Sequence, residues 1–402
     1  MSARMSVHYR LQCSTDAIDA RARALAVEQS IEMPIEAVRD ERVRAEVVGE
    51  VVTIEPSPQF DDLFDVVLAL AVETAGDEPG QLLNVVFGNC SLQPDVELID
   101  LELPETTLAK LPGPRFGTDG WREATRAPGA APVESGAEAR RPLSCTALKP
   151  QGLDAQSLAG LAYVFARAGI DVVKDDHGIA DQQCAPFAQR VPLVQRAIER
   201  ANRDKRDGPD GALAAHRSIY APTLSGGPQR LARQLAIAHD EGVGALLCCP
   251  MIIGVPAFAE LVRAEAGVPL LAHPALAGHL RIAAPLLLGR LFRLFGADAT
   301  IFPNWGGRFR HTRAECLAIA DRAREPLGEH RGALPVPAGG MRVERIDEIV
   351  GAYGIDTMLL IGGDLLRAGD ALGERAAQFV RRVRRFTRDG TVDGGDAEAV
   401  DA

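Results

Sequence analysis

Four consecutive polar residues, Lys174, Asp175, Asp176 and His177, follow a short apolar run and have the side chains best suited to chemistry. Because side chains alternate along an extended segment, Lys174 and Asp176 share one face. An ammonium group cannot bind a metal ion, but a lysine that CO₂ converts to a carbamate offers an anionic oxygen. Carbamate and carboxylate oxygens suit Mg²⁺, which keeps other positions open for substrate. A solvated run of charges is the simpler alternative, and the residues alone leave both interpretations open.

Other apolar runs also end in polar residues or glycines. Two Gly-Gly pairs are notable, because backbone N–H groups can approach phosphate oxygens closely only where side chains are absent. The pairs therefore favour a phosphate site over simple turns. A lone histidine in such a position can equally be a packed core residue. These run ends are Lys149-Pro150, His273-Pro274, residues 303–308, Gly339-Gly340 and Gly362-Gly363.

The runs that carry these residues recur in a regular pattern. Continuous apolar runs are typical of buried parallel strands, and amphipathic stretches such as 154–168, 229–240, 313–323 and 343–352 separate them. Eight such units in about 250 residues fit a (β/α)₈ barrel better than an open sheet, and the chemistry of that fold lies at the carboxyl ends of the strands. The runs are 144–149, 170–174, 216–222, 245–250, 268–273, 299–303, 334–338 and 358–362.

The chain before residue 119 has a mixed pattern, which predicts a smaller N-terminal α+β domain. We expect this domain to span residues 1–118 and the barrel to span 119–402. Helices are expected over 16–29 and 61–72, and extended segments over 45–55, 82–87 and 96–103. The Pro-, Gly- and Ala-rich segment 113–142 predicts a connection with little regular structure.

Composition excludes several classes of protein. A net charge of −11 disfavours nucleic-acid or anionic-membrane surfaces. The sequence has no apolar run long enough to span a membrane and no signal-peptide core at its start, so a cytoplasmic enzyme is expected. Seven scattered cysteines without a Cys-x-x-Cys pair indicate reduced thiols and no zinc site.

In order and spacing, these motifs resemble the RuBisCO superfamily, and specifically its RuBisCO-like (form IV) branch. The resemblance covers nearly the whole chain. The strand-two motif, Gly-x-Asp-x-x-Lys-Asp-Asp-Glu in the family, is very specific. The segments that carry the resemblance are 146–150, 169–177, 270–275, 336–340 and 361–363, with 26–30 and 87–89 in the N-terminal domain.

The resemblance implies roles for individual residues. Lys174 would be a carbamylated metal ligand, Asp176 a second ligand, and Lys149 the acid or base beside the reacting carbon. Asn89 of a neighbouring subunit would contact the metal-bound substrate, and Glu28 lies in another segment that completes the partner's site. The cofactors implied are Mg²⁺, or Mn²⁺, and CO₂ as the carbamate. Phosphate would be held by Gly339, Gly340, Gly362 and Gly363. The family also implies a ferredoxin-like N-terminal domain and a homodimer or larger assembly with its sites between subunits.

Departures from the family pattern narrow the chemistry. His177 replaces a glutamate, so the third metal ligand is a nitrogen or is missing, and imidazole suits Mn²⁺ better than Mg²⁺. Pro274 and Ile301 replace residues that hold a second phosphate, which predicts a monophosphate substrate. Arg308 stands near the place of the mobile lysine that assists carboxylation. His273 and Arg308 are candidate catalytic residues. Because these departures remove residues that the family uses with a bisphosphate, CO₂ fixation is not expected.

The residues that match the family are those needed for enolate chemistry on a phosphorylated, sugar-like substrate. The Lys-Asp-Asp-His variant resembles most closely the subgroup that decarboxylates 3-oxo-isoapionate 4-phosphate in carbohydrate catabolism, and this is the first hypothesis. The alternative is a methionine-salvage enzyme, either a 2,3-diketo-5-methylthiopentyl-1-phosphate enolase or a 5-methylthioribulose-1-phosphate isomerase. A non-catalytic protein that binds sugar phosphates is a third reading, and Lys149, Lys174 and Asp176 argue against it.

Overall fold

The N-terminal domain is an antiparallel sheet with helices between its strands. This computed structural model describes residues 3–58, 60–128, 140–206 and 216–386. The strands β1 (Arg4–Gln12), β2 (Glu50–Pro56), β3 (Leu63–Ala71) and β4 (Val96–Glu102) are ordered β2-β3-β1-β4, with α1 (Ile18–Glu28) after β1 and α2 (Pro79–Phe87) after β3. This β-α-β-β-α-β order is the ferredoxin-like arrangement that was expected.

Two of the predictions for this domain are wrong. Residues 61–72, expected to be helical, contain strand β3, in which buried and half-buried residues alternate. Val67 and Ala69 occupy half-buried positions but are apolar. The sequence of this strand therefore does not alternate between apolar and polar residues, and its two-residue period could not be recognised. Residues 82–87, expected to be extended, belong to α2. That helix begins with Pro79 after Glu78, whose side chain accepts a hydrogen bond from the Gln81 N–H at 2.6 Å.

The second domain confirms the expected (β/α)₈ barrel. Its parallel strands form two sheets, ordered β13-β5-β6-β7 and β12-β11-β10-β9-β8, that meet where β7 continues into β8 and where β12 lies beside β13. Leu143, Val172, Leu271, Val336 and Met358, from strands all round the barrel, belong to one buried interior cluster. The strands are β5 (Leu143–Leu148), β6 (Val172–Asp175), β7 (Ile219–Ala221), β8 (Thr223–Leu224), β9 (Leu246–Cys248), β10 (Leu270–Ala272), β11 (Ala299–Pro303), β12 (Leu334–Ala338) and β13 (Met358–Leu360).

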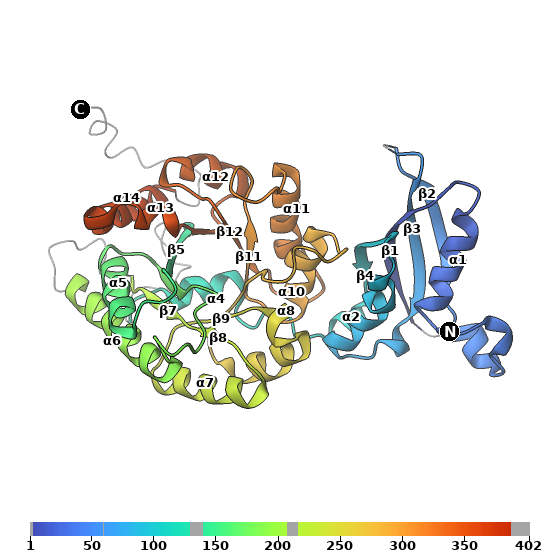
Figure 1. Ribbon diagram of the computed structural model, residues 1–402, viewed down its shortest axis with the longest axis horizontal. Helices are drawn as coiled ribbons and strands as arrows, with labels where there is room; N and C mark the ends of the chain where they lie inside the picture. The colour runs from blue at the N-terminus through green and yellow to red at the C-terminus, as the bar shows by residue number, and fades with distance from the viewer. Residues whose placement is uncertain (1–2, 59, 129–139, 207–215, 387–402) are drawn as a thin grey trace.

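Helices surround this barrel, as Figure 1 shows. The longest, α6, contains Pro192 within its first two turns. The helices are α5 (Ala155–Arg167), α6 (Phe187–Arg206), α7 (Pro228–Asp240), α8 (Pro250–Ile253), α9 (Arg263–Ala266), α10 (Phe292–Leu294), α11 (Arg313–Arg324), α12 (Ile346–Tyr353), α13 (Gly363–Leu366) and α14 (Leu372–Arg384). None of the described helices is long and apolar enough to cross a membrane.

The amino end of the barrel is closed by a helix that the sequence did not predict. Segment 113–142, expected to have little regular structure, contains helix α4 (Gly117–Ala124). Its Trp121 is fully buried in the interior cluster, beside the first residues of the strands. Helix α4 has few apolar residues, so its sequence shows no helical period of apolar positions. The division expected at residue 118 falls inside α4 and stays a prediction.

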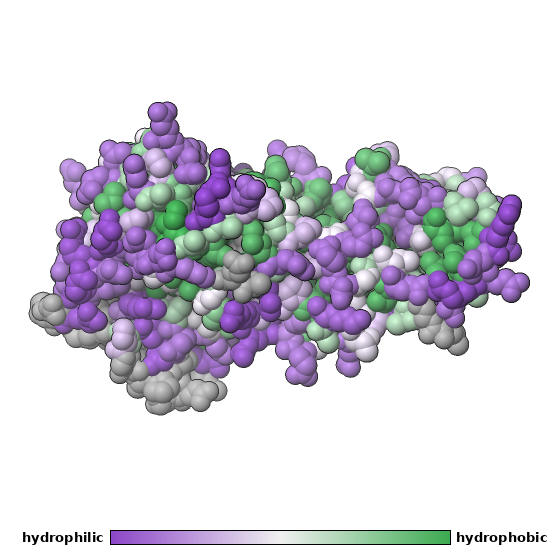
Figure 2. All heavy atoms as spheres, turned by 90° about the horizontal axis from the view of Figure 1, so that it is seen from below, coloured by the Kyte–Doolittle hydropathy of each residue, from purple (hydrophilic) through white to green (hydrophobic). Residues whose placement is uncertain are grey.

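The N-terminal domain lies beside the barrel, with β4 and α2 nearest to it (Figure 1). Backbone hydrogen bonds join the two, from the Leu98 N–H to the Arg281 carbonyl at 2.9 Å and from the Ala283 N–H to the Leu98 carbonyl at 2.8 Å. Arg290 and Asp100 form an ion pair at 2.8 Å across the same junction. Figure 2 shows that one face of the molecule is mostly hydrophilic, with small separate hydrophobic groups, one of them over the N-terminal domain.

Candidate active site

Residues from the ends of β5, β6 and β10 meet at the carboxyl end of the barrel. Lys149 and Asp176 form an ion pair, and the Nδ1 atom of His177 lies 3.4 Å from the Asp176 Oδ1 atom. The rings of His177 and His273 are stacked, with centroids 4.0 Å apart and planes 12° from parallel. The structure therefore brings together the residues that the strand-end argument singled out on three different strands.

Lys174 is buried at the centre of this group, with 3% of its surface exposed. Its Nζ atom donates a hydrogen bond to the Asp175 carbonyl at 2.8 Å. Burial lowers the pKa of Lys174, and Asp176 and the neighbouring groups only partly offset it. Only a neutral amine can react with CO₂, so a buried lysine with a lowered pKa is chemically suited to form a carbamate.

The carboxylate of Asp176 is held in its ionised form. Burial alone would raise its pKa, but the hydrogen bond from Lys149, the Gly178 N–H and the charge of Lys174 hold that pKa well below its usual range. The Gly178 N–H reaches Oδ1 at 3.0 Å. Asp176 is thus an anionic oxygen donor just after the end of β6.

Burial disfavours the charged form of both histidines. Burial, together with the charge of Lys174 and the neighbouring His177, lowers the pKa of His273 to about 2. Its Nδ1 atom accepts a hydrogen bond from the Ala275 N–H at 3.2 Å, so the proton of the neutral ring is on Nε2. Burial also lowers the pKa of His177. Each ring therefore has a lone pair or an N–H to offer, but no charge.

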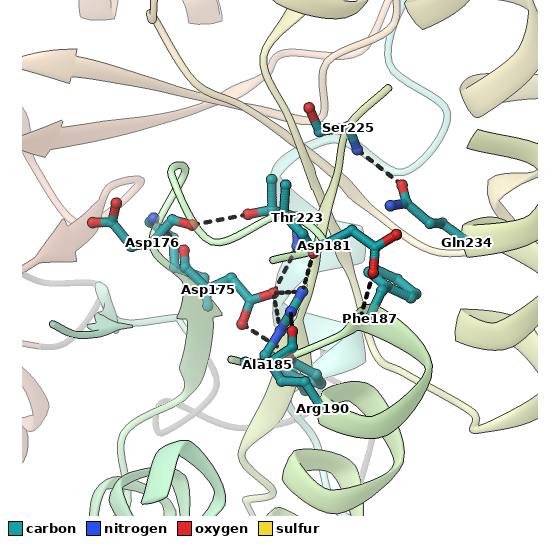
Figure 3. A network of polar contacts seen from close by, with 12 residues as sticks. Asp175, Asp176, Asp181, Ala185, Phe187, Arg190, Thr223, Ser225 and Gln234 are labelled. Carbon is teal, nitrogen blue, oxygen red and sulfur yellow. Dashed lines mark hydrogen bonds and ion pairs between the residues drawn. The ribbon is translucent and has the colours of Figure 1, made fainter. Parts of the chain in front are cut away.

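A buried network beneath the site holds the segment that carries these ligands (Figure 3). Asp175 is fully buried and points away from Asp176. Its carboxylate accepts hydrogen bonds from Arg190 at 3.1 and 3.2 Å, from the Tyr220 hydroxyl at 2.7 Å and from the Thr223 N–H at 3.0 Å. Because Asp175 is anchored, the side chains on either side of it are turned toward the mouth.

Arg190 also holds the loop after β6 in place. It donates to the carbonyl groups of Ala180 and Ala185 at 2.8 and 2.6 Å. Nearby, the Asp181 carboxylate accepts from the Phe187 N–H at 2.8 Å. The loop between β6 and α6 is therefore fixed at both ends by one buried arginine and one carboxylate.

Replacing Arg190 with methionine is expected to destabilise the barrel strongly. The change leaves Asp175 buried without its cation, which costs about 3–5 kcal/mol of unfolding free energy. Urea unfolding followed by tryptophan fluorescence measures this, since Trp121 and Trp305 both lie in the barrel. The control is Arg10→Met, which breaks an exposed ion pair with Asp65 and should cost less than about 1 kcal/mol. Equal losses in the two variants would contradict this account.

The glycine pairs differ in what surrounds them. A Cβ atom on Gly307 would lie 1.9 Å from the Gly339 carbonyl oxygen, and one on Gly340 would lie 2.8 Å from the Gly307 Cα. Packing between the loops after β11 and β12 therefore requires glycine there, whatever binds. At Gly362 a Cβ would meet only the Lys149 Cε at 3.8 Å, and at Gly363 it would meet nothing. The second pair is open and lies next to Lys149.

The loop after β11 carries Arg308 and Phe309 at the mouth. The Arg308 guanidinium lies 4.9 Å from the centre of the Phe309 ring, and its charge acts on His177. The Phe309 ring lies against Gly339, where a Cβ would approach it to 3.1 Å. Arg308 is thus an exposed cation of this loop, and Phe309 covers Gly339 after β12.

Exposed hydrophobic side chains gather on one side of the mouth, called here its apolar side, next to the charged Arg308. Among the described residues, the large hydrophobic side chains that are exposed on the barrel domain are Ile252, Leu276 and Phe309. They follow β9, β10 and β11, which are neighbours in the sheet. Leu276 is 72% exposed and has a positive φ of 66°, a conformation rare for leucine. Pro274 lies on the same loop, and Ile301 is buried in β11. Neither side chain carries a charge that could hold a second phosphate.

Asn89 and Glu28 are brought together in the N-terminal domain. The Asn89 side-chain amide donates to the Glu28 carboxylate at 3.0 Å. In the part of the chain that the structure describes, neither residue makes a hydrogen bond or ion pair with the strand-end residues of the barrel. Leu92, which follows them, is 83% exposed.

Two donors at the mouth, Asp176 and His177, are of kinds that bind divalent ions. Among the described residues, no three His, Cys, Asp or Glu side chains form a metal-binding group. Asp176 and His177 supply two converging donor atoms, so a third must come from elsewhere. A carbamate on the buried Lys174 would supply it, as an anionic oxygen of the kind that Mg²⁺ and Mn²⁺ accept. These three residues would then hold the ion and leave its other positions to substrate and water.

Sequence reasoning missed the groups that position this site. Arg190 and Tyr220 come from a helix and a strand distant from the motif, and their pairing with Asp175 had no local signal. Asn304 is buried and accepts a hydrogen bond from the Tyr353 hydroxyl at 2.7 Å, which holds the loop after β11. Asn304 lies in the run end 303–308 that the sequence analysis singles out, but nothing in the sequence indicates its hydrogen bond with Tyr353.

Comparisons with known proteins agree with this geometry. The family described as "Ribulose bisphosphate carboxylase large chain, catalytic domain" matches residues 136–280. The chain is 47% identical to "Ribulose bisphosphate carboxylase-like protein 1" of Rhodopseudomonas palustris, over 95% of this chain and 98% of that one. It is 44% identical to the "5-methylthioribulose-1-phosphate isomerase" of Rhodospirillum rubrum, over 95% and 97%. The crystal structure of a Rubisco-like protein from Rhodopseudomonas palustris superposes with a TM-score of 0.84, at 43% identity, over 96% of this chain and 99% of that one.

Proposed function

This chain belongs to the RuBisCO-like protein family, and from that premise we propose that it is an isomerase of a ketose monophosphate with an apolar end. Such an enzyme moves a proton between neighbouring carbons and shifts a carbonyl group along the chain, with no CO₂ fixed or released. The substrate that fits best is 5-methylthioribulose 1-phosphate. The apolar side of the mouth, opposite the open Gly362-Gly363 pair, is the observation that carries this proposal.

Two findings favour this reading over decarboxylation of 3-oxo-isoapionate 4-phosphate, which the Lys-Asp-Asp-His motif had placed first. A relative that is 44% identical over almost its whole length is named as the isomerase. A hydroxylated sugar acid would also leave polar groups against Leu276, Ile252 and Pro274, where buried polar groups without partners are costly. A methylthio end would bury apolar surface at the same place. Decarboxylation therefore becomes the second candidate.

This proposal gives each residue at the mouth a role in the reaction. The open backbone at Gly362 and Gly363 receives the phosphate, which places the first carbons of the substrate beside Lys149. Lys149 takes and returns the proton. The Nε2–H group of His273 and the Arg308 guanidinium donate hydrogen bonds to substrate oxygens. Lys174, as the carbamate, Asp176 and His177 hold the divalent ion, which when bound would polarise the carbonyl group of the substrate.

We also propose a homodimer, or a larger assembly, in which the N-terminal domain of one subunit completes the mouth of the other. Among the described residues, the hydrogen-bonded Asn89–Glu28 pair makes no hydrogen bond or ion pair with the strand ends of its own barrel, and the exposed Leu92 beside it matches the apolar side of the mouth. Asn89 would then approach the substrate from the partner.

Replacing Leu276 with asparagine tests the apolar end directly. Asparagine tolerates the positive φ at this position, so the fold is expected to be kept. The KM for 5-methylthioribulose 1-phosphate should rise by about 10- to 200-fold, the effect of losing an apolar contact of about 1–3 kcal/mol. The matched control is ribulose 1-phosphate, which ends in a hydroxyl group and should lose nothing. A KM that stays unchanged for the methylthio substrate would remove Leu276 from the site.

A further inference from the structure

We infer that His177 binds the divalent ion through Nδ1, that His273 is a positioning residue which orients it by stacking, and that the ligand set therefore prefers Mn²⁺ to Mg²⁺. This inference rests on the proposed function only in so far as the site holds a metal ion. It adds which atom of this chain replaces the family's glutamate, what holds that atom in place, and how the choice of metal changes.

The position of the imidazole carries the first step. The His177 Nδ1 atom and the Asp176 Oδ1 atom lie 3.4 Å apart. Two adjacent ligands of one octahedral cation lie about 3 Å apart when each bond is about 2.1 Å long. The two atoms are therefore almost at the separation of paired ligands. Among the described residues, the polar contact of His177 Nδ1 is with the Asp176 Oδ1 atom, the oxygen beside which a shared metal ion would lie.

The stack with His273 carries the second step. The two rings are nearly parallel, at 12° and 4.0 Å, so the stack fixes the plane of the His177 ring, and the Nδ1 edge of that ring lies beside Asp176. His273 is itself held by the hydrogen bond from the Ala275 N–H to its Nδ1 atom, at 3.2 Å. A ring that is fixed in this way presents one edge of His177 to Asp176. Residues that orient a ligand typically change metal affinity by about 10- to 100-fold when they are replaced.

The third step follows from the chemistry of the donors. A carbamate, an aspartate and a glutamate would give three anionic oxygens, whereas this chain offers two and a neutral nitrogen. Mg²⁺ is a hard ion that prefers oxygen ligands, and first-row transition ions accept imidazole more readily. Histidine in place of glutamate at position 177 thus weakens the binding of Mg²⁺ more than the binding of Mn²⁺.

Pulsed electron paramagnetic resonance of bound Mn²⁺ tests this without an activity measurement. The protein is loaded with Mn²⁺ and bicarbonate, and coupling to a directly bound ¹⁴N nucleus is recorded. The wild type is expected to show this coupling. His177→Glu and His177→Gln should lose it, while the matched control His279→Glu, an exposed histidine on the loop after β10, should keep it. Circular dichroism confirms that each variant is folded.

Titration calorimetry with Mn²⁺ and with Mg²⁺ tests the preference. The wild type should bind Mn²⁺ about tenfold or more tightly than Mg²⁺, and His177→Glu should reduce or reverse that ratio. His273→Ala should weaken Mn²⁺ binding by about 10-fold or more, whereas His273→Phe, which keeps a ring to stack on, should weaken it less. Absence of ¹⁴N coupling in the wild type, or coupling that survives in His177→Glu, would overturn the inference. Isomerase activity in that same protein would leave the proposed function standing.

Discussion

Replacing Lys174 with alanine is expected to abolish turnover and leave the fold intact. Without the lysine there is no carbamate, and the site loses an anionic ligand at the centre of the mouth. Metal-ion catalysis contributes several kcal/mol, so the rate should fall by about a thousandfold or more. Folding should not suffer, because burial already disfavours the charge of this ammonium group. Turnover, circular dichroism and the ¹³C signal of a carbamate formed from ¹³C-bicarbonate measure the three expectations.

Two controls separate this effect from a general loss of structure. Lys205 is also buried, but it donates to the Ser218 hydroxyl at 3.1 Å at the opposite end of the barrel, so Lys205→Ala should keep activity and the carbamate signal. Mixing inactive Lys174→Ala subunits with inactive Asn89→Ala subunits should restore part of the activity, because hybrid dimers contain one intact site. Full activity of the Lys174→Ala protein would refute the role of the carbamate.

Lys149→Met is expected to lower kcat by about 10²- to 10⁴-fold, the usual contribution of a positioned acid or base. Lys149 lies next to the open glycine pair and pairs with Asp176, so its amine is near both the substrate and the metal ligands. Methionine keeps the length of the side chain but cannot transfer a proton. Nuclear magnetic resonance of the reaction mixture follows formation of the isomer.

Metal binding separates a catalytic role of Lys149 from a structural one. If Lys149 acts on the substrate, the Met variant still binds Mn²⁺, because Asp176 loses only its Lys149 partner and keeps the hydrogen bond from the Gly178 N–H. A variant that has lost both the metal and the activity would show that Lys149 supports the site and does not act on the substrate. Turnover at the wild-type rate would exclude Lys149 as the acid or base.

The barrel was predictable from the sequence because its strands are buried on both faces. Such strands appear as continuous apolar runs, and all eight predicted runs overlap strands of the barrel. The N-terminal domain was less predictable. In β3 the half-buried positions hold Val67 and Ala69, so its two-residue period was hidden, and in α2 the run from Leu82 to Phe87 has the composition of a strand.

The site was predictable where chemistry is local in sequence. Lys174, Asp176 and His177 are neighbours in the chain, and their position at a strand end predicted where they would meet Lys149. What could not be predicted depends on tertiary contacts. The His177–His273 stack joins two strands, and the Asp175–Arg190 pair joins a strand to a helix. The loops after β11 and β12 also need glycine because they pack against each other, and the spacing of residues in the sequence does not indicate this contact.

The most direct test of the central claim is to incubate the wild-type protein with Mg²⁺ or Mn²⁺, bicarbonate and 5-methylthioribulose 1-phosphate, and to follow the mixture by ¹H and ³¹P nuclear magnetic resonance. We expect an isomeric ketose monophosphate of unchanged composition, with no CO₂ released. Parallel incubation with 3-oxo-isoapionate 4-phosphate should give little or no CO₂. If the methylthio substrate is left unchanged while the oxo acid phosphate loses CO₂, the proposed isomerase is wrong and the chain is a decarboxylase.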